Sequence, residues 1–126
     1  MQIYTSYFAN VKNLPPNILP ISITNITPQG WKYPIYQKLA PSDKILKNWK
    51  QTHANLDYIF DYEDEILSQL KLNDVMDDLL HFLKDDYTDI SLICYEKPTD
   101  FCHRHLVADW VKQNHIQCKE WGEEYI

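Results

Sequence analysis

The hydrophobic positions along the chain follow two periods and predict a domain in which strands and helices alternate. Residues 91–95 form a run without polar alternation that is flanked by charge, a pattern typical of a strand covered on both faces. Residues 2–5 and 19–24 predict two earlier strands, and residues 116–121 alternate in the manner of an edge strand. We therefore expect residues 91–95 to lie in the middle of a sheet.

Apolar residues at helical spacing predict three helices between the second and third strands. The first covers residues 43–50 with Ser42 as its N-cap, and the last covers residues 75–83 with Asn73 as its cap. The middle helix begins near Asn55. Its expected buried stripe consists of Leu56, Ile59, Phe60, Ile66, Leu67 and Leu70.

A fourth helix is expected directly after the central strand. Pro98 interrupts the strand pattern, and Thr99 and Asp100 can cap the free amides at the start of a helix. Apolar residues then recur at helical spacing up to residue 111, so residues 102–105 fall in the first turn. A helix N-terminus collects unpaired N–H groups and the positive end of the helix dipole, which favours an anion or a thiolate.

The order of these elements predicts an α/β fold. A strand, helix and strand at the C-terminus, joined by a right-handed crossover, imply a parallel sheet. We expect one domain over residues 1–126 with a small, mostly parallel sheet of about four strands. Helices on both faces would make it a Rossmann-like three-layer sandwich. In such sheets ligands bind outside the carboxyl ends of the strands.

Charge and cysteine content narrow the class of protein. The net charge is −6, and acidic residues cluster in residues 57–65 and 74–89, so nucleic acid could be contacted only through a local patch. Three cysteines without CxxC spacing favour a reducing, cytoplasmic environment over a disulfide scaffold. The sequence contains no apolar run long enough to cross a bilayer, so no membrane association is expected. The oligomeric state is left open.

The candidate catalytic residues are Cys102, His103 and Arg104 in the first turn of the fourth helix, together with Glu96 after the central strand. Arg104 is the only arginine of the chain. Its planar guanidinium can bind carboxylate or phosphate through two donors, which lysine cannot do. In the competing interpretation Arg104 pairs with Glu96 or Asp100 and only fastens the loop. Further ligand-binding candidates at the same edge of the sheet are Thr5, Ser6, Tyr7, Asn25 and Lys97.

Residues 94–98 (Cys-Tyr-Glu-Lys-Pro) and 101–110 (Phe-Cys-His-Arg-His-Leu-Val-Ala-Asp-Trp) form a Cys-x-Glu, short loop, Cys-His-Arg signature. In these residues, and more weakly over nearly the whole chain, the sequence resembles the domain-of-unknown-function 488 (DUF488) family. The resemblance implies an α/β domain with a site at the Cys-His-Arg loop and leaves the biochemical function open. Relatives commonly end the second strand in arginine, whereas Thr24 and Asn25 stand here, which argues against a two-arginine anion clamp.

Two interpretations of the Cys-His-Arg turn involve a ligand but no metal. In one, Cys102 is a nucleophile whose pKa is lowered by the helix N-terminus, His103 and Arg104, with Glu96 orienting an imidazole. In the other, which we favour, Arg104, His103 and backbone amides hold a small phosphate-bearing molecule or nucleotide without covalent chemistry. Whether the protein is an enzyme is left open. The alternative function is a non-catalytic accessory module that binds nucleic acid or protein.

A third interpretation places zinc on Cys94, Cys102 and either His103 or His105. The seven-residue gap followed by adjacent ligands matches no common zinc-binding spacing, so we predict no metal and no cofactor. Cys94 lies inside an apolar strand and is expected to be an inert core thiol.

Overall fold

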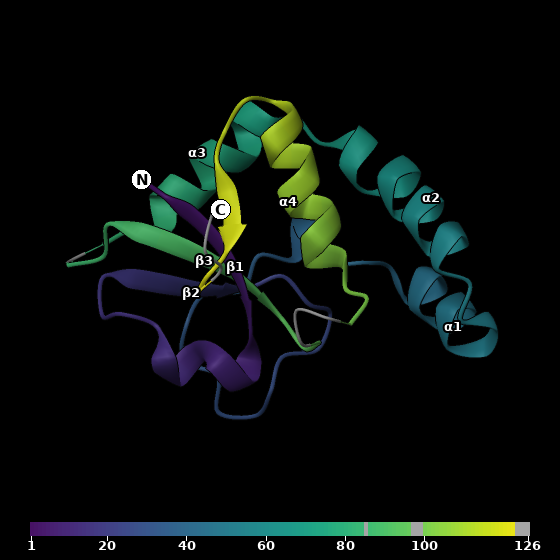
Figure 1. The fold of residues 1–126 in the computed structure, drawn as a ribbon, viewed down its shortest axis with the longest axis horizontal. Helices are drawn as coiled ribbons and strands as arrows, with labels where there is room; N and C mark the ends of the chain where they lie inside the picture. The colour runs from purple at the N-terminus through teal and green to yellow at the C-terminus, as the bar shows by residue number, and fades with distance from the viewer. Residues whose placement is uncertain (85, 97–99, 123–126) are drawn as a thin grey trace.

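The computed structural model describes residues 1–84, 86–96 and 100–122. In these residues parallel strands form one four-stranded sheet in the order β2-β3-β1-β4 (Figure 1). The strands are β1 (Ile3–Tyr7), β2 (Ile18–Ser22), β3 (Asp89–Cys94) and β4 (Cys118–Glu120). The predicted α/β fold class with a small parallel, Rossmann-like sheet is confirmed.

β3 lies between β2 and β1, which confirms the prediction of a central strand covered on both faces. The strand register places Tyr7 beside Cys94 and Ser22 beside Ile93. Three strands therefore end at the same edge of the sheet. β4 pairs with β1 and occupies the edge position, as the alternating pattern near the C-terminus predicted.

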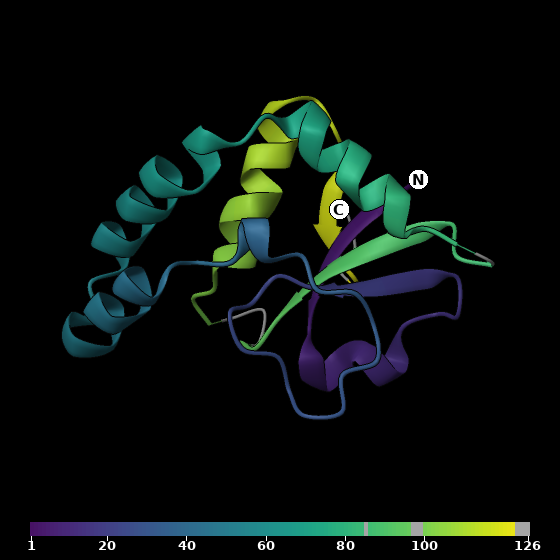
Figure 2. The ribbon, with the colours of Figure 1, turned by 180° about the vertical axis from the view of Figure 1, so that it is seen from behind.

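Helices lie on both sides of the sheet (Figures 1 and 2). α3 (Leu72–Phe82) and α4 (His103–Gln113) cover one side, and the 3₁₀ helix η1 (Phe8–Asn13) lies on the other. α1 (Asp43–Thr52) and α2 (Asn55–Glu65) form a hairpin that projects from the domain beside α4. Two short 3₁₀ turns, η2 (Gln37–Leu39) and η3 (Leu67–Gln69), flank this hairpin. None of the described helices is long and apolar enough to span a membrane.

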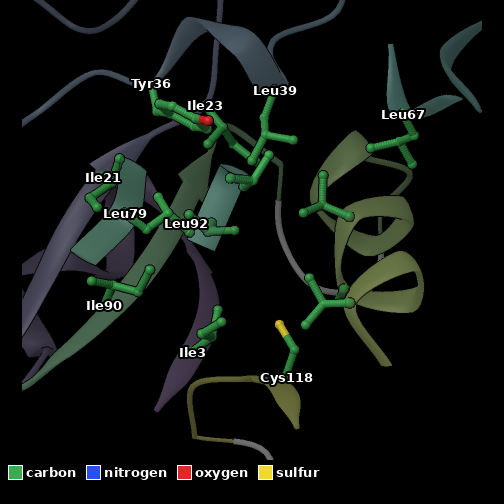
Figure 3. Close-up of a cluster of buried hydrophobic side chains, with 14 of the residues drawn as sticks. Ile3, Ile21, Ile23, Tyr36, Leu39, Leu67, Leu79, Ile90, Leu92 and Cys118 are labelled. Atoms are coloured by element: carbon green, nitrogen blue, oxygen red, sulfur yellow. The ribbon is translucent and has the colours of Figure 1, made fainter. Parts of the chain in front are cut away.

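The hydrophobic core lies between the sheet and the helices α3 and α4 (Figure 3). Ile3, Ile21, Ile90 and Leu92 from the strands and Leu79 from α3 are all fully or almost fully buried. Apolar side chains on one face of parallel strands require such a helical cover, since a parallel sheet is seldom exposed to water. This packing fixes α4, and with it the first turn of α4, above the carboxyl edge of the sheet.

The buried face of α2 differs from the prediction. Leu56 and Phe60 of the expected stripe are 81% and 68% exposed, whereas Tyr58 and Tyr62 are buried. The Tyr62 hydroxyl donates a hydrogen bond to the carbonyl oxygen of Leu39 at 2.6 Å. Because tyrosine combines an apolar ring with a polar tip that needs a partner, two tyrosines can form a buried face that a count of aliphatic residues misses.

The predicted helix caps are confirmed only in part. Ser42 is the N-cap of α1 and accepts a hydrogen bond from the Ile45 amide at 3.2 Å. Asn55 and Asn73 lie inside α2 and α3 instead of capping them. The N-cap of α4 is Cys102 and not Asp100, and Thr99, the other cap candidate, lies outside the described residues.

Replacement of Leu79 by alanine should lower the free energy of unfolding by about 2–5 kcal/mol, because it removes a fully buried side chain between α3 and the sheet. Leu80→Ala is the matched control on the same helix, since Leu80 is 48% exposed, and it should cost about 1 kcal/mol or less. Urea unfolding of the two variants measures the difference. Equal losses would contradict the assigned face of α3.

Candidate functional site

Arg104 connects three elements at the carboxyl edge of the sheet. Its side chain is completely buried, and its Nε and Nη2 atoms donate to the two carboxylate oxygens of Glu120 at 2.9 and 3.0 Å. Its Nη1 atom donates to the Glu96 carbonyl oxygen at 2.6 Å and to the Cys94 sulfur at 3.0 Å. The guanidinium carbon of Arg104 lies over the ring of Tyr7, 5.7 Å from the ring centroid. One side chain thus ties the first turn of α4 to β4 and to the end of β3.

The Thr5 hydroxyl completes this arrangement by donating to Glu120 at 2.7 Å. We expected Arg104 either to hold a phosphate or to pair with the side chain of Glu96 or Asp100. The structure instead engages all of its nitrogens with protein groups and makes Glu120 the paired carboxylate. Sequence analysis missed Glu120 because only the register between β1 and β4, which aligns it with Thr5, brings it to Arg104.

Cys94 and Cys102 lie together although they are eight positions apart in the sequence. The structure joins them by a disulfide, and both side chains are buried. Cys94 is therefore not the inert core thiol that its strand pattern predicted. The strand end and the helix start converge at this edge, so two cysteines of different elements meet without a CxxC motif. The third cysteine, Cys118, is free and buried, and burial raises its pKa to about 12.

His103 is buried beside the two sulfurs. Its Nε2 atom is 2.6 Å from the carbonyl oxygen of Ile23, and because a carbonyl can only accept, Nε2 carries the proton. Its Nδ1 atom lies 3.7 Å from the Cys102 sulfur. Burial, reinforced by the charge of Arg104, lowers the pKa of His103 to about 4. The imidazole is neutral at pH 7, so His103 places no positive charge beside the Cys102 sulfur.

His105, the other imidazole of this turn, faces away from the sulfurs. It lines a second pocket near β4, and its Nε2 atom has no hydrogen-bond partner among the described residues. Burial and the nearby Arg104 lower its pKa. Of His103 and His105, only His103 lies beside Cys94 and Cys102.

A pocket of about 250 Å³ opens above Cys94, Cys102 and His103. We call it the aromatic pocket because four rings line it together with a few polar side chains. Its aromatic residues are Trp49, Tyr58, Tyr95 and Phe101, and its polar residues are Thr24, Asn25, Lys50 and Glu96. It lies at the carboxyl end of β3, where ligands bind in sheets of this type.

The predicted ligand-binding residues are divided between two places. Asn25 lines the aromatic pocket, where its amide donates to the Pro41 carbonyl oxygen at 2.6 Å. Thr5 and Tyr7 line the second pocket, of about 600 Å³, which Glu120 also lines. Ser6 is fully buried and accepts a hydrogen bond from Asn10 at 3.1 Å. Lys97 lies outside the described residues. The candidates from β1 therefore do not line the aromatic pocket, although Tyr7 is the register partner of Cys94.

A family model described as the active DUF488-N3 subclade matches residues 10–115. The chain belongs to the DUF488 family. The match covers both cysteines of the disulfide, His103 and Arg104, and it ends before Glu120. No curated protein and no solved structure matches this DUF488 protein.

Glu120→Gln should lower the free energy of unfolding by about 3 kcal/mol, because it leaves the buried charge of Arg104 without a charged partner. Asp109→Asn is the matched control, since Asp109 forms an exposed ion pair with Lys112 at 3.8 Å and should cost less than about 1 kcal/mol. Chemical unfolding at neutral pH measures both values. Similar losses of unfolding free energy in the two variants would show that the Arg104–Glu120 pair stabilises the fold no more than an exposed ion pair does.

Proposed function

We propose that this DUF488 protein binds a nucleotide-type, phosphate-bearing ligand in the aromatic pocket. The observation that supports the proposal most directly is the combination in one pocket of several aromatic rings with a helix N-terminus. Bases stack on aromatic side chains, and phosphates bind at helix N-termini, so each part of such a ligand has a matching surface.

The base would lie against the aromatic wall formed by Trp49, Tyr58 and Phe101. Trp49 and Phe101 are close to parallel, with ring centroids 6.2 Å apart, and Tyr58 meets Phe101 edge to face at 4.9 Å. Trp49 comes from α1, Tyr58 from α2 and Phe101 from the residue before the N-cap of α4, so the projecting hairpin forms one wall of the pocket. Stacking on such rings contributes about 1–3 kcal/mol per base and tolerates any base.

The phosphate would lie between Lys50 and the first turn of α4. Lys50 supplies a positive charge at the pocket, and the first amides of a helix have no partner within that helix. Arg104 has a positioning role in this proposal, because its guanidinium is engaged with Glu120, Glu96 and Cys94. It holds the helix start in place and does not contact the ligand.

Three of the four predicted catalytic residues, Glu96, Cys102 and His103, line the pocket and would act on a bound ligand if the protein is an enzyme. A covalent role for Cys102 requires that its bond to Cys94 first be reduced. Turnover is therefore to be tested on the reduced protein, with Cys102→Ser as the variant that should lose it.

Calorimetric titration with a nucleoside monophosphate, the parent nucleoside and inorganic phosphate tests the binding proposal. We expect the monophosphate to bind more tightly than the nucleoside. Lys50→Gln should weaken monophosphate binding roughly five-fold, the equivalent of an ion pair of about 1 kcal/mol. Lys47→Gln on the same helix is the matched control, because Lys47 does not line the pocket.

Trp49→Ala should weaken the nucleoside and the monophosphate alike, by at least about five-fold, since it removes a stacking surface. The proposal fails if the four common monophosphates show no binding at millimolar concentration. It also fails if Lys47→Gln and Lys50→Gln have the same effect.

A further inference from the structure

Cys94, Cys102 and His103 form a compact cluster of metal-ligating atoms. The two sulfurs and a ring nitrogen all lie within 4.8 Å of one another, and all three side chains are buried. Ligand atoms around a tetrahedral zinc ion lie about 2.0–2.3 Å from the metal and therefore about 3.3–3.8 Å from each other. The two sulfurs are bonded to each other in this structure, so the three atoms can reach one ion only after reduction allows the sulfurs to separate.

His103 is already oriented as a metal ligand. A ligating histidine commonly donates its second ring N–H to a backbone carbonyl, which fixes the ring and its tautomer. The Nε2–H group of His103 makes this hydrogen bond to Ile23, and the lone pair of Nδ1 is left on the side of the Cys102 sulfur. The ring of Tyr62 packs against the imidazole, with the two ring centroids 5.6 Å apart, and limits rotation of the imidazole.

After reduction of the disulfide, Arg104 is in position to stabilise Cys94 as a thiolate. Its Nη1 atom donates to the Cys94 sulfur at 3.0 Å, and a guanidinium donor stabilises a thiolate more than a thiol. Two thiolates and a neutral imidazole balance the charge of a divalent ion. Arg104 is itself balanced by Glu120, so a loaded site adds no net charge to this buried region.

We propose that Cys94, Cys102 and His103, in the reduced protein, bind a zinc-type divalent metal ion at the floor of the aromatic pocket. Two molecules of a thiol reductant supply two electrons and two protons and become a disulfide themselves, which converts the protein disulfide into two thiols. A phosphine supplies the two electrons instead and becomes a phosphine oxide, while water supplies its oxygen and the two protons. The ion then displaces the two thiol protons and forms two metal–sulfur bonds and one metal–nitrogen bond. The inference goes beyond ligand binding in the pocket and does not rest on it.

The number of protein ligands decides whether the metal ion keeps an open coordination position. Structural zinc sites are closed by four protein ligands, whereas three ligands leave one tetrahedral position for water or substrate. All three residues line the aromatic pocket, so the remaining position is directed to the pocket. The Cα atoms of Cys94 and Cys102 are 7.3 Å apart, wider than the roughly 4.4–6.8 Å usual for a disulfide, and this separation suits two ligands of one ion.

The spacing of Cys94, Cys102 and His103 matches no common zinc motif, but common spacings do not apply to ligands from two different elements. Spacing rules describe ligands that share one knuckle or finger, whereas here the ligands come from the end of β3 and the start of α4. The parallel sheet brings these two elements together.

Metal content of the reduced full-length protein tests the proposal. The phosphine-reduced chain is incubated with Zn²⁺, desalted and analysed, and we expect one equivalent per chain. Incubation with Co²⁺ should give the intense thiolate-to-cobalt absorption of a tetrahedral cysteine site. The same chain with its disulfide intact should bind neither ion, which is a control that needs no substitution.

Single variants then assign the ligands. Cys94→Ser, Cys102→Ser and His103→Gln should each weaken Zn²⁺ binding by at least about 100-fold, since substitutions outside the ligand shell already cost about 10–100-fold. Cys118→Ser and His105→Gln are the matched controls and should retain one equivalent. Reduced wild-type protein that binds no more Zn²⁺ than the oxidised form would overturn the proposal. So would a Co²⁺ complex without thiolate absorption, or an equal loss in Cys118→Ser.

Discussion

The structure depends on how a completely buried arginine is neutralised. Removing a charged group from water costs several kcal/mol, so Arg104 can occupy its position only if a carboxylate meets it in good geometry. Glu120 meets it through two parallel hydrogen bonds, and Thr5 orients the same carboxylate. The pairing requires β4 to lie in one register on β1, because a shift by one residue would turn Glu120 to the other face.

The same ion pair connects two pockets at the carboxyl edge. Glu120 lines the second pocket beside β4, and Arg104 bonds both to Glu120 and to Cys94, which lines the aromatic pocket. Thr5 and Tyr7 line the second pocket, whereas Asn25 and Glu96 line the first. The Nη1 atom of Arg104 also donates a hydrogen bond to the Cys94 sulfur, so the ion pair is linked to the two cysteines. A charge buried for structural reasons thereby also determines the electrostatics of the candidate site.

The sequence predicted much of the fold because its signals are local. The apolar run at the centre of β3, the alternation near β4 and the Ser42 cap depend on neighbouring residues alone, and the structure bears them out. The α2 face was wrong because Tyr62 is buried through a hydrogen bond to Leu39, a residue of a different segment. The partnership of Arg104 with Glu120 and the meeting of Cys94 with Cys102 likewise depend on tertiary contacts that no residue spacing encodes.

Arg104 is a buried, positioning arginine held by Glu120, and because it is the only arginine of the chain its environment can be measured directly. A proton–nitrogen correlation spectrum of the labelled protein contains a single arginine Nε–H resonance. If Glu120 holds Arg104, this resonance is visible at neutral pH and its proton is protected from exchange with water. The Arg104 Nε nitrogen also shows a scalar coupling, through the Nε–H···Oε1 hydrogen bond, to the carboxylate carbon of Glu120. An Nε–H proton that exchanges as fast as that of free arginine would contradict it.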